Sequence, residues 1–247
     1  MARRIQSPSS INMYKRCPRK YYLHYILRKP TKPSIHLYRG SIVHSAINQF
    51  EKLGIKTAIE ADFQPLRAKL HIIYKNEWKK QAQDILKLHL QKEELLSFYT
   101  ESLQMLDNWL QEFISEHARG PPQKKVELKL FSSPEYSIMG IVDVIKEDEN
   151  GIAILDYKTA KDPVLSDEYK LQLAMYALLY EESFKKRPTQ VGIHFLKYKD
   201  GIKMIEVDDG LLNLAKKEAK LIHINTMSND PKDYPCTCGG WCERDFI

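Results

Sequence analysis

Two neighbouring strand candidates in the second half of the chain carry charged side chains on faces that are otherwise apolar. Residues 136–146 and 151–159 read as strands, and the polar, glycine-ended link between them predicts a β-hairpin. Because residues i and i+2 of a strand share a face, Asp156 and Lys158 are expected to point the same way. A buried charge without a partner is costly, so this hairpin must bring each charged group a partner or a metal ion.

Asp143 lies on the first of these strands and is expected to share a face with Ile141 and Ile145. If the two strands pair, Asp143 and Asp156 converge on one hard cation, and oxygen ligands suit Mg²⁺ or Mn²⁺. Lys158 could then hold an attacking water or stabilise charge on a phosphate. A structural Asp156–Lys158 ion pair, with Asp143 at a strand edge, fits the same spacing.

Two helices add polar side chains to apolar faces. Residues 166–184 predict an amphipathic helix, on which Gln172 and Tyr176 share one face because they are four residues apart. His44 lies on a largely apolar helix that follows Gly40. The alternative is a core Tyr176 with Gln172 at the boundary, and a His44 that is satisfied within the core.

The periodicity along the chain predicts the fold class. Residues 61–118 are helical in pattern with few breakers, and Gly120-Pro121-Pro122 ends that stretch. A period of two then takes over, and the second half reads as strands, helix, strands and helix. This order predicts an α/β or α+β fold with a sheet core. The further strand candidates lie at 126–131, 189–198 and 203–207, and the last helix at 211–227.

The four cysteines are unevenly placed. Cys17 stands alone, whereas Cys236, Cys238 and Cys242 lie within seven residues of one another. Four are too few for a disulfide scaffold in a chain of this length, and the spacing is more typical of metal ligands. The sequence therefore predicts a metal centre that joins the two ends of the chain, with four inert or redox-active thiols as the alternative.

Positive charge gathers at the N-terminus. The chain carries a net charge of +6, but its first 50 residues hold ten Lys or Arg and no Asp or Glu. Such a segment suits a polyanion, since each cation that neutralises a phosphate releases counterions. Tyr21, Tyr22 and Tyr25 could stack bases there, or they could pack inside the protein. A solvated basic face fits the charge equally well, and a transit peptide is disfavoured because the segment contains Cys17.

The composition excludes several classes of protein. At 43% hydrophobic and 28% charged residues it is that of a globular chain. No apolar run approaches the roughly 18 residues of a membrane span, and no secretory h-region follows the first charges. We expect a cytoplasmic protein with no membrane partner.

The ordered motifs together resemble a known family. Gly40 with His44, Gly140 with Asp143, Asp156 with Lys158, and Gln172 with Tyr176 match the order G-x-x-x-H, G-x-x-D, D-x-K and Q-x-x-x-Y. This order resembles that of the PD-(D/E)xK nucleases of RecB type. The stretch from Ser7 through Cys17-Pro18-Arg19-Lys20-Tyr21-Tyr22 also resembles the N-terminal motif of their iron–sulfur branch, which includes CRISPR-associated exonucleases and helicase–nuclease repair complexes.

The resemblance implies a role for each residue. His44, Asp143 and Asp156 would bind the divalent metal, with the Tyr157 carbonyl as a further ligand. Lys158 would position or activate the water, and Gln172 and Tyr176 would support the site or contact the DNA backbone. The implied catalytic residues are Asp143, Asp156, Lys158, Gln172 and Tyr176. The residues expected to bind nucleic acid are Arg16, Arg19, Lys20 and Tyr21.

The resemblance also implies a [4Fe–4S] cluster on Cys17, Cys236, Cys238 and Cys242, with a tetrahedral Cys₄ zinc site as the rival. The family usually shows C-x2-C-x5-C at its C-terminal end, whereas this chain shows C-x-C-x3-C. The identity of the centre is therefore left open here between iron–sulfur and zinc.

The expected architecture is one RecB-like nuclease domain over residues 1–247. Its restriction-endonuclease-like core has a mixed central sheet flanked by helices, with a helical insertion and a terminal cysteine-bound cluster. We expect a basic segment at 1–35, the insertion at 55–120, the sheet core at 121–210 and the cysteine segment at 228–247.

The expected function is Mg²⁺- or Mn²⁺-dependent DNA hydrolysis. The resemblance favours a single-stranded DNA exonuclease with some endonuclease activity, in DNA repair, CRISPR adaptation or viral DNA processing. It also allows CRISPR adaptation or repair proteins as partners and a homo-oligomer. The alternative is a non-catalytic nucleic-acid-binding or adaptor protein that keeps the nuclease fold.

Overall fold

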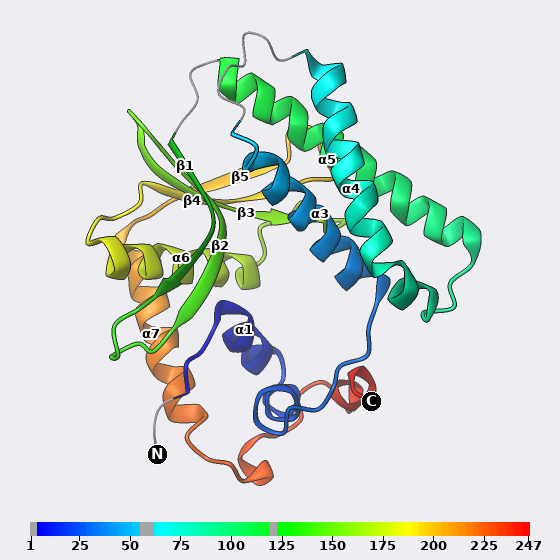
Figure 1. The fold of residues 1–247 in the computed structure, drawn as a ribbon. Helices are drawn as coiled ribbons and strands as arrows, with labels where there is room; N and C mark the ends of the chain where they lie inside the picture. The colour runs from blue at the N-terminus through cyan, green and yellow to red at the C-terminus, as the bar shows by residue number, and fades with distance from the viewer. Residues whose placement is uncertain (1–3, 55–61, 119–122) are drawn as a thin grey trace.

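A five-stranded sheet forms the centre of the molecule (Figure 1). The computed structural model describes residues 4–54, 62–118 and 123–247, and the side chains of 123–126 are not considered. The strands are β1 (Gln123–Phe131), β2 (Met139–Asp148), β3 (Gly151–Lys158), β4 (Gln190–Phe195) and β5 (Ile202–Glu206). They lie in the order β1-β2-β3-β4-β5.

The connections explain why the sheet is mixed. β1, β2 and β3 form an antiparallel meander, because short links join them. The helix α6 (Asp167–Phe184) then crosses over, so β4 pairs with β3 in parallel, and β5 returns antiparallel to β4. The predicted mixed sheet is confirmed.

One face of the sheet is covered by α6 and by α7 (Asp209–Asn225). As predicted, α6 is capped by Ser166, whose side chain accepts a hydrogen bond from the Tyr169 N–H. Its acids in the first turn complement the helix dipole. Nine residues of α6 are buried, most of them in the core between this helix and the sheet.

The other face is covered by α3 (Ile35–Glu51), α4 (Phe63–Leu86) and α5 (Lys92–Ala118). The predicted loop around residues 27–38 is too long by four residues, because Ser34 caps α3 and the helix begins at Ile35. Gly40 therefore lies inside the helix and does not open it. α4 and α5 form the predicted helical stretch, and no described helix is long and apolar enough to cross a bilayer.

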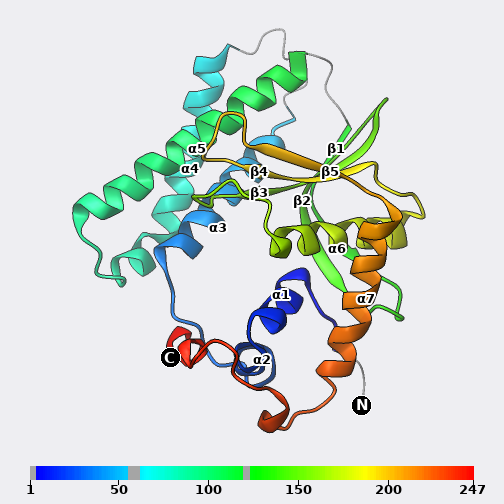
Figure 2. The same cartoon turned by 180° about the vertical axis from the view of Figure 1, so that it is seen from behind.

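The remaining elements form a small lobe, here called the cysteine lobe (residues 4–34 and 228–247). Its helices are α1 (Pro8–Arg16), α2 (Pro18–Tyr21), the π-helix η1 (Tyr22–Ile26), and the 3₁₀ helices η3 (Pro231–Asp233) and η4 (Trp241–Asp245). Figures 1 and 2 agree that segments from the two ends of the chain lie side by side here. A separate apolar cluster holds the lobe together, and it consists of Tyr21, Tyr22, Leu23, Tyr234 and Phe246.

Candidate active site

The β2–β3 hairpin carries both predicted carboxylates. Its ladder runs from Asp148–Gly151 to Val144–Leu155 and ends there, immediately before Asp143 on one strand and Asp156 on the other. Beyond the ladder, the Tyr157 N–H donates to Oδ2 of Asp143 over 2.8 Å. The hairpin is confirmed, and it places the two carboxylates next to each other at the point where the strands part.

The expected face of Asp143 is wrong in one respect. Val142 and Ile145 pack on the α6 side of the sheet, whereas Val144 packs on the α3 side, so the alternation of faces shifts by one residue beside Asp143. Glu127 lies opposite on β1 with φ 50°, which marks an irregularity for a non-glycine residue in a strand. Asp143 therefore does not share a face with Ile145. The shift turns its carboxylate toward α3.

His44 reaches Asp143 from α3. Its Nδ1 lies 3.2 Å from Oδ1 of Asp143, and the imidazole side chain is 29% exposed. Burial alone would lower the pKa of His44, but the hydrogen bond and the negative charge of Asp143 raise it above its usual value. Two residues that are 99 positions apart are thus joined at the edge of the hairpin.

Asp156 is surrounded by three of the predicted side chains. The Nζ of Lys158 lies 2.5 Å from Oδ2, which confirms that the two groups share a face of β3. From α6, the Gln172 amide donates to Oδ1 over 3.0 Å and the Tyr176 hydroxyl donates to the same oxygen over 3.2 Å. Gln172 also donates to the Tyr176 hydroxyl over 2.8 Å, so the two helix residues form one unit that fixes Oδ1.

The charge balance around Asp156 is unfavourable in the absence of a cation. Burial raises the pKa of Asp156; Lys158 lowers it, but burial and the nearby Asp143 outweigh that ion pair. Its Oδ2 is buried and accepts no hydrogen bond, because the close contact with Lys158 lacks hydrogen-bond geometry. A buried carboxylate oxygen in this state is a vacant electron-pair donor.

The donor set fits a divalent metal ion of the hard type. Asp143 and Asp156 supply carboxylate oxygens, and His44 supplies an imidazole nitrogen beside them. Mg²⁺ and Mn²⁺ take oxygen-rich sites, and a positive ion there would relieve the raised pKa of Asp156. The Tyr157 side chain is buried on the α3 side of the sheet, where its hydroxyl accepts from Trp109, so only its main chain can serve the metal.

Gly140 leaves the space that Tyr176 needs. A Cβ built on Gly140 would lie 2.8 Å from Cδ1 of Leu179 and 3.2 Å from Cε1 of Tyr176. Gly140→Ala is therefore expected to lower the free energy of unfolding by about 1–3 kcal/mol, as measured by urea denaturation.

A matched control is Gly40→Ala, because a Cβ there has only Thr159 Oγ1 nearby, at 3.9 Å. Gly40 lies inside α3, where alanine is the better helix former, so we expect no loss of stability from this change. Equal stability of Gly140→Ala and wild type would contradict the packing described here.

Two contributors were missed from the sequence. Arg39 is buried and donates to the Thr159 carbonyl over 2.9 Å, which anchors the chain just after Lys158. It also forms an ion pair with Glu101 of α5. Tyr169 lies under Lys158, whose Nζ is 5.5 Å from the ring centre. Tyr169 precedes Gln172 by three residues, so helical spacing could have revealed it, whereas nothing local indicates the contacts of Arg39.

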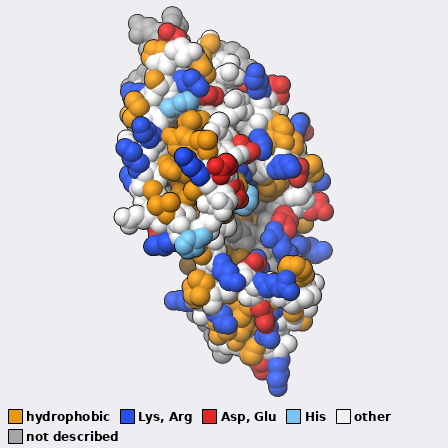
Figure 3. Space-filling model, turned by 90° about the vertical axis from the view of Figure 1, so that its right-hand side faces the viewer, with side chains coloured by type: hydrophobic (Ala, Val, Ile, Leu, Met, Phe, Trp, Pro, Cys, Tyr) orange, Lys and Arg blue, Asp and Glu red, His pale blue; other side chains and the backbone are white. Residues whose placement is uncertain are grey.

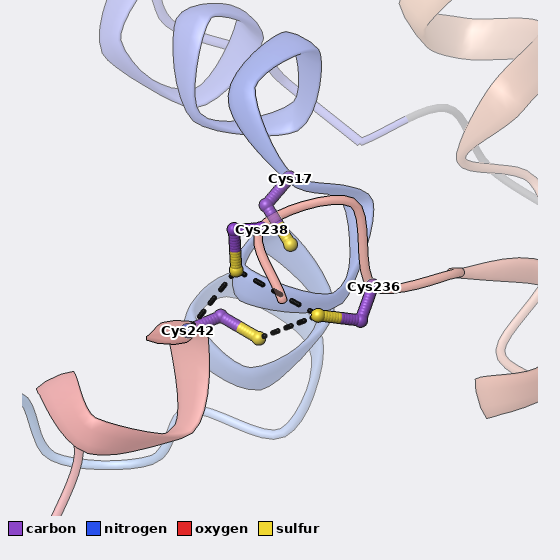
Figure 4. A group of neighbouring side chains, drawn as sticks. All are labelled: Cys17, Cys236, Cys238 and Cys242. Atoms are coloured by element: carbon purple, nitrogen blue, oxygen red, sulfur yellow. Dashed lines mark hydrogen bonds between the residues drawn. The ribbon is translucent and has the colours of Figure 1, made fainter. Parts of the chain in front are cut away.

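The four cysteines come together as predicted, from both ends of the chain (Figure 4). Their Sγ atoms all lie within 4.8 Å of one another, which makes the group able to hold a metal. Cys17 and Cys242 are buried, whereas Cys236 is exposed.

Backbone amides are directed at these sulfurs. The Gly240 N–H donates to Sγ of Cys236 over 3.2 Å, and the Cys242 N–H donates to Sγ of Cys238 over 3.1 Å. Burial raises the pKa of the Cys17 thiol, but hydrogen bonds from the backbone of Thr237 and Lys20 outweigh it and lower that pKa to about 6. Such bonds favour thiolates, which are the metal-binding form.

The predicted nucleic-acid-binding residues have different environments. Tyr21 is 1% exposed and packs on Tyr234, so its ring is closed to a base, and the prediction that it binds nucleic acid is wrong. Arg16 pairs with Glu168, and Lys20 pairs with Asp245. Arg19 is bonded through its guanidinium to the Pro231 carbonyl only, at 3.4 Å, and keeps most of its donors for a ligand.

Comparisons with known proteins agree with this geometry. Over 84 residues, or 29% of this chain, the chain is 29% identical to a subunit of the ATP-dependent helicase/nuclease of Bacillus mycoides and 27% identical to the same subunit of the Bacillus cereus enzyme. The match spans only 6% of the length of those relatives. A crystal structure of a candidate exonuclease from Eubacterium rectale covers the whole chain and 89% of its own length, with a TM-score of 0.55 at 14% identity, and so shares the fold. The family model of the PD-(D/E)XK nuclease superfamily matches residues 6–244, and the chain belongs to that superfamily.

Proposed function

We propose that this protein is an Mg²⁺- or Mn²⁺-dependent exonuclease that hydrolyses single-stranded DNA from an end, with some endonuclease activity. The observation that carries the proposal is the buried, hydrogen-bond-free Oδ2 of Asp156 beside Lys158 and next to the His44–Asp143 pair. A purely structural ion pair would need neither the second carboxylate nor the histidine.

The residues divide the work of phosphodiester hydrolysis. A divalent ion held by His44, Asp143 and Asp156 would supply positive charge for the phosphate and make a water more acidic. Lys158 is placed to donate a hydrogen bond to the attacking water or to a phosphate oxygen, because its ammonium is 23% exposed at the same carboxylate. Gln172 and Tyr176 hold Oδ1 of Asp156 and so fix the direction of Oδ2.

A basic strap (residues 27–34) supports the choice of substrate. The strap connects the cysteine lobe to α3, whose Arg39 anchors the chain beside Lys158. It is tied to the C-terminal residues, since the Lys32 N–H donates to Asp245 and the Ile247 N–H donates to Pro30. Its charged side chains are exposed and form no ion pair among the described residues. They are Arg28, Lys29 and Lys32.

The molecular surface on this side fits a passage for one DNA strand. Figure 3 shows a recess between the helices above and the cysteine lobe below, with Lys and Arg side chains along its lower rim. A flexible single strand could follow such a recess to the carboxylates, since its phosphates would meet cations on the way.

Removing the charge of the strap is expected to weaken DNA binding. In the triple variant Arg28→Gln, Lys29→Gln and Lys32→Gln, the salt slope of single-stranded DNA binding should fall by up to about two units, because each phosphate contact contributes about 0.7. Fluorescence anisotropy over a range of salt concentrations measures it. The matched control neutralises Lys216, Lys217 and Lys220 on α7, on the other side of the molecule (Figure 1). An equal effect of both variants would show that the strap is only part of a diffuse positive field.

The mode of cutting is tested with wild-type protein on three kinds of substrate. Linear single strands should be degraded with Mg²⁺ or Mn²⁺, and end-labelling gives the polarity. Linear duplexes should be poorer substrates, and circular single strands should be cut only slowly. Rapid cutting of circles would replace the exonuclease proposal by an endonuclease.

The pathway is part of the proposal. The similarity to helicase/nuclease proteins supports a role in DNA repair, and CRISPR adaptation or viral DNA processing would use the same chemistry. We propose a cytoplasmic protein, and a pull-down would identify helicase or CRISPR partners and any homo-oligomer. The cysteine centre completes the proposal, either as the [4Fe–4S] cluster that the resemblance implies or as zinc.

A further inference from the structure

The cysteine sulfurs lie unusually close together for a large cofactor. The Cys236 Sγ is 3.6 Å from that of Cys238 and 3.5 Å from that of Cys242. The group as a whole, including Cys17, has no pair of ligand atoms further apart than 4.8 Å. Figure 4 shows the four side chains directed at one another around a small common space.

A single metal ion fits this spacing. Four atoms whose greatest separation is 4.8 Å can all lie within about 2.9 Å of one point, and a zinc–thiolate bond is about 2.3 Å long. In a regular tetrahedron, that bond length puts the sulfurs about 3.8 Å apart. The observed separations lie on both sides of this value, so only small shifts would complete the coordination.

A [4Fe–4S] cluster does not fit the same space. Each of its thiolates binds a different iron at a corner of a cube of irons and sulfides, so the cysteine sulfurs stand outside the whole cube. They would all have to move outward. The residues present therefore disagree with the cofactor that the resemblance implies.

The local sequence explains the small site. C-x-C-x3-C has shorter loops than the C-x2-C-x5-C pattern, and shorter loops keep the three sulfurs closer. Gly239 and Gly240 both have positive φ, at 63° and 83°, which makes the tight turn between Cys238 and Cys242. The amides that donate to Cys236 and Cys238 come from this same turn and from the first turn of η4, so the backbone holds the compact arrangement.

We propose that Cys17, Cys236, Cys238 and Cys242 bind one Zn²⁺ ion in tetrahedral coordination. Each bound sulfur is a thiolate, and the protons of the thiols are released to solvent on binding. Zinc has no redox chemistry, so the centre joins the chain ends without responding to oxygen. This inference does not rest on the nuclease activity.

Metal analysis of the full chain tests the proposal. The protein is expressed with both iron and zinc in the medium and purified without oxygen, so that a labile cluster would survive. We expect about one zinc per chain, no acid-labile sulfide and no broad visible absorption. Cys236→Ser, at the exposed ligand, should lose the zinc, whereas Asp156→Asn should retain it, which separates this site from the carboxylates. Cobalt added to metal-free protein should give the visible bands of a tetrahedral tetrathiolate site.

Iron and sulfide in equal amounts, at about four each per chain, would overturn the proposal. Protein without bound metal would do so as well, and so would zinc that remains bound in Cys236→Ser. If Cys236→Ser does not fold, the stoichiometry and the cobalt spectrum of the wild-type chain still decide between one ion and a cluster.

Discussion

Replacing Asp156 with asparagine is expected to reduce DNA hydrolysis by about a thousandfold or more, because a metal ligand worth several kcal/mol of transition-state stabilisation is lost. The same change is expected to leave the chain at least as stable as wild type. Burial raises the pKa of Asp156, so its ionised form costs stability at neutral pH. The neutral amide removes that cost and keeps a carbonyl oxygen for Gln172 and Tyr176.

The sign of this effect follows from proton linkage. A carboxyl group with a raised pKa in the folded state binds its proton more tightly there, so the stability it contributes is lost as the pH rises through that pKa. Asparagine should abolish this contribution. Thermal unfolding and single-turnover cleavage are measured together, with Asp200→Asn in the exposed β4–β5 turn as the control. A variant that is both active and less stable would mean that Asp156 serves the core and not catalysis.

Replacing Cys17 with serine is expected to have the largest effect on stability. Cys17 is the ligand that joins the N-terminal helices to the three cysteines near residue 240, more than 200 positions away. A cross-link that closes a loop of this length stabilises by about 5 kcal/mol in the chain-entropy treatment, which sets the scale of the loss. The cysteine lobe should open, since only its small apolar cluster and a few backbone bonds remain.

Limited proteolysis detects this opening, because the basic strap and the C-terminal residues should become cleavable in Cys17→Ser. Chemical denaturation gives the global loss. Ser9→Ala, on the exposed side of α1, is the control and should match wild type. An intact, protease-resistant lobe in Cys17→Ser would contradict a role for the centre in joining the chain ends.

The parts of the site that could be predicted depend on short-range periodicity. The Asp156–Lys158 pair follows from a strand period of two, and the Gln172–Tyr176 unit follows from a helix period of 3.6. The hairpin turn fixes which strands meet. Local rules therefore reach every residue whose partner lies on the same element or the next one.

The parts that could not be predicted depend on packing between distant segments. The face of Asp143 changes because of an irregularity opposite Glu127, which no local pattern reveals. Tyr21 is buried because Tyr234 packs on it from the other end of the chain. His44 could be matched to Asp143 only through the resemblance to a family, since the contact spans two elements and 99 residues.

The most direct test is cleavage of end-labelled single-stranded DNA with Mg²⁺ or Mn²⁺ by wild type, Lys158→Ala and Lys217→Ala. Lys217 is exposed on α7 and serves as the matched control. We predict metal-dependent cutting by wild type and Lys217→Ala, and none by a folded Lys158→Ala that still binds DNA. Equal cutting by Lys158→Ala would place the activity elsewhere, and DNA binding without cutting by wild type would favour the adaptor.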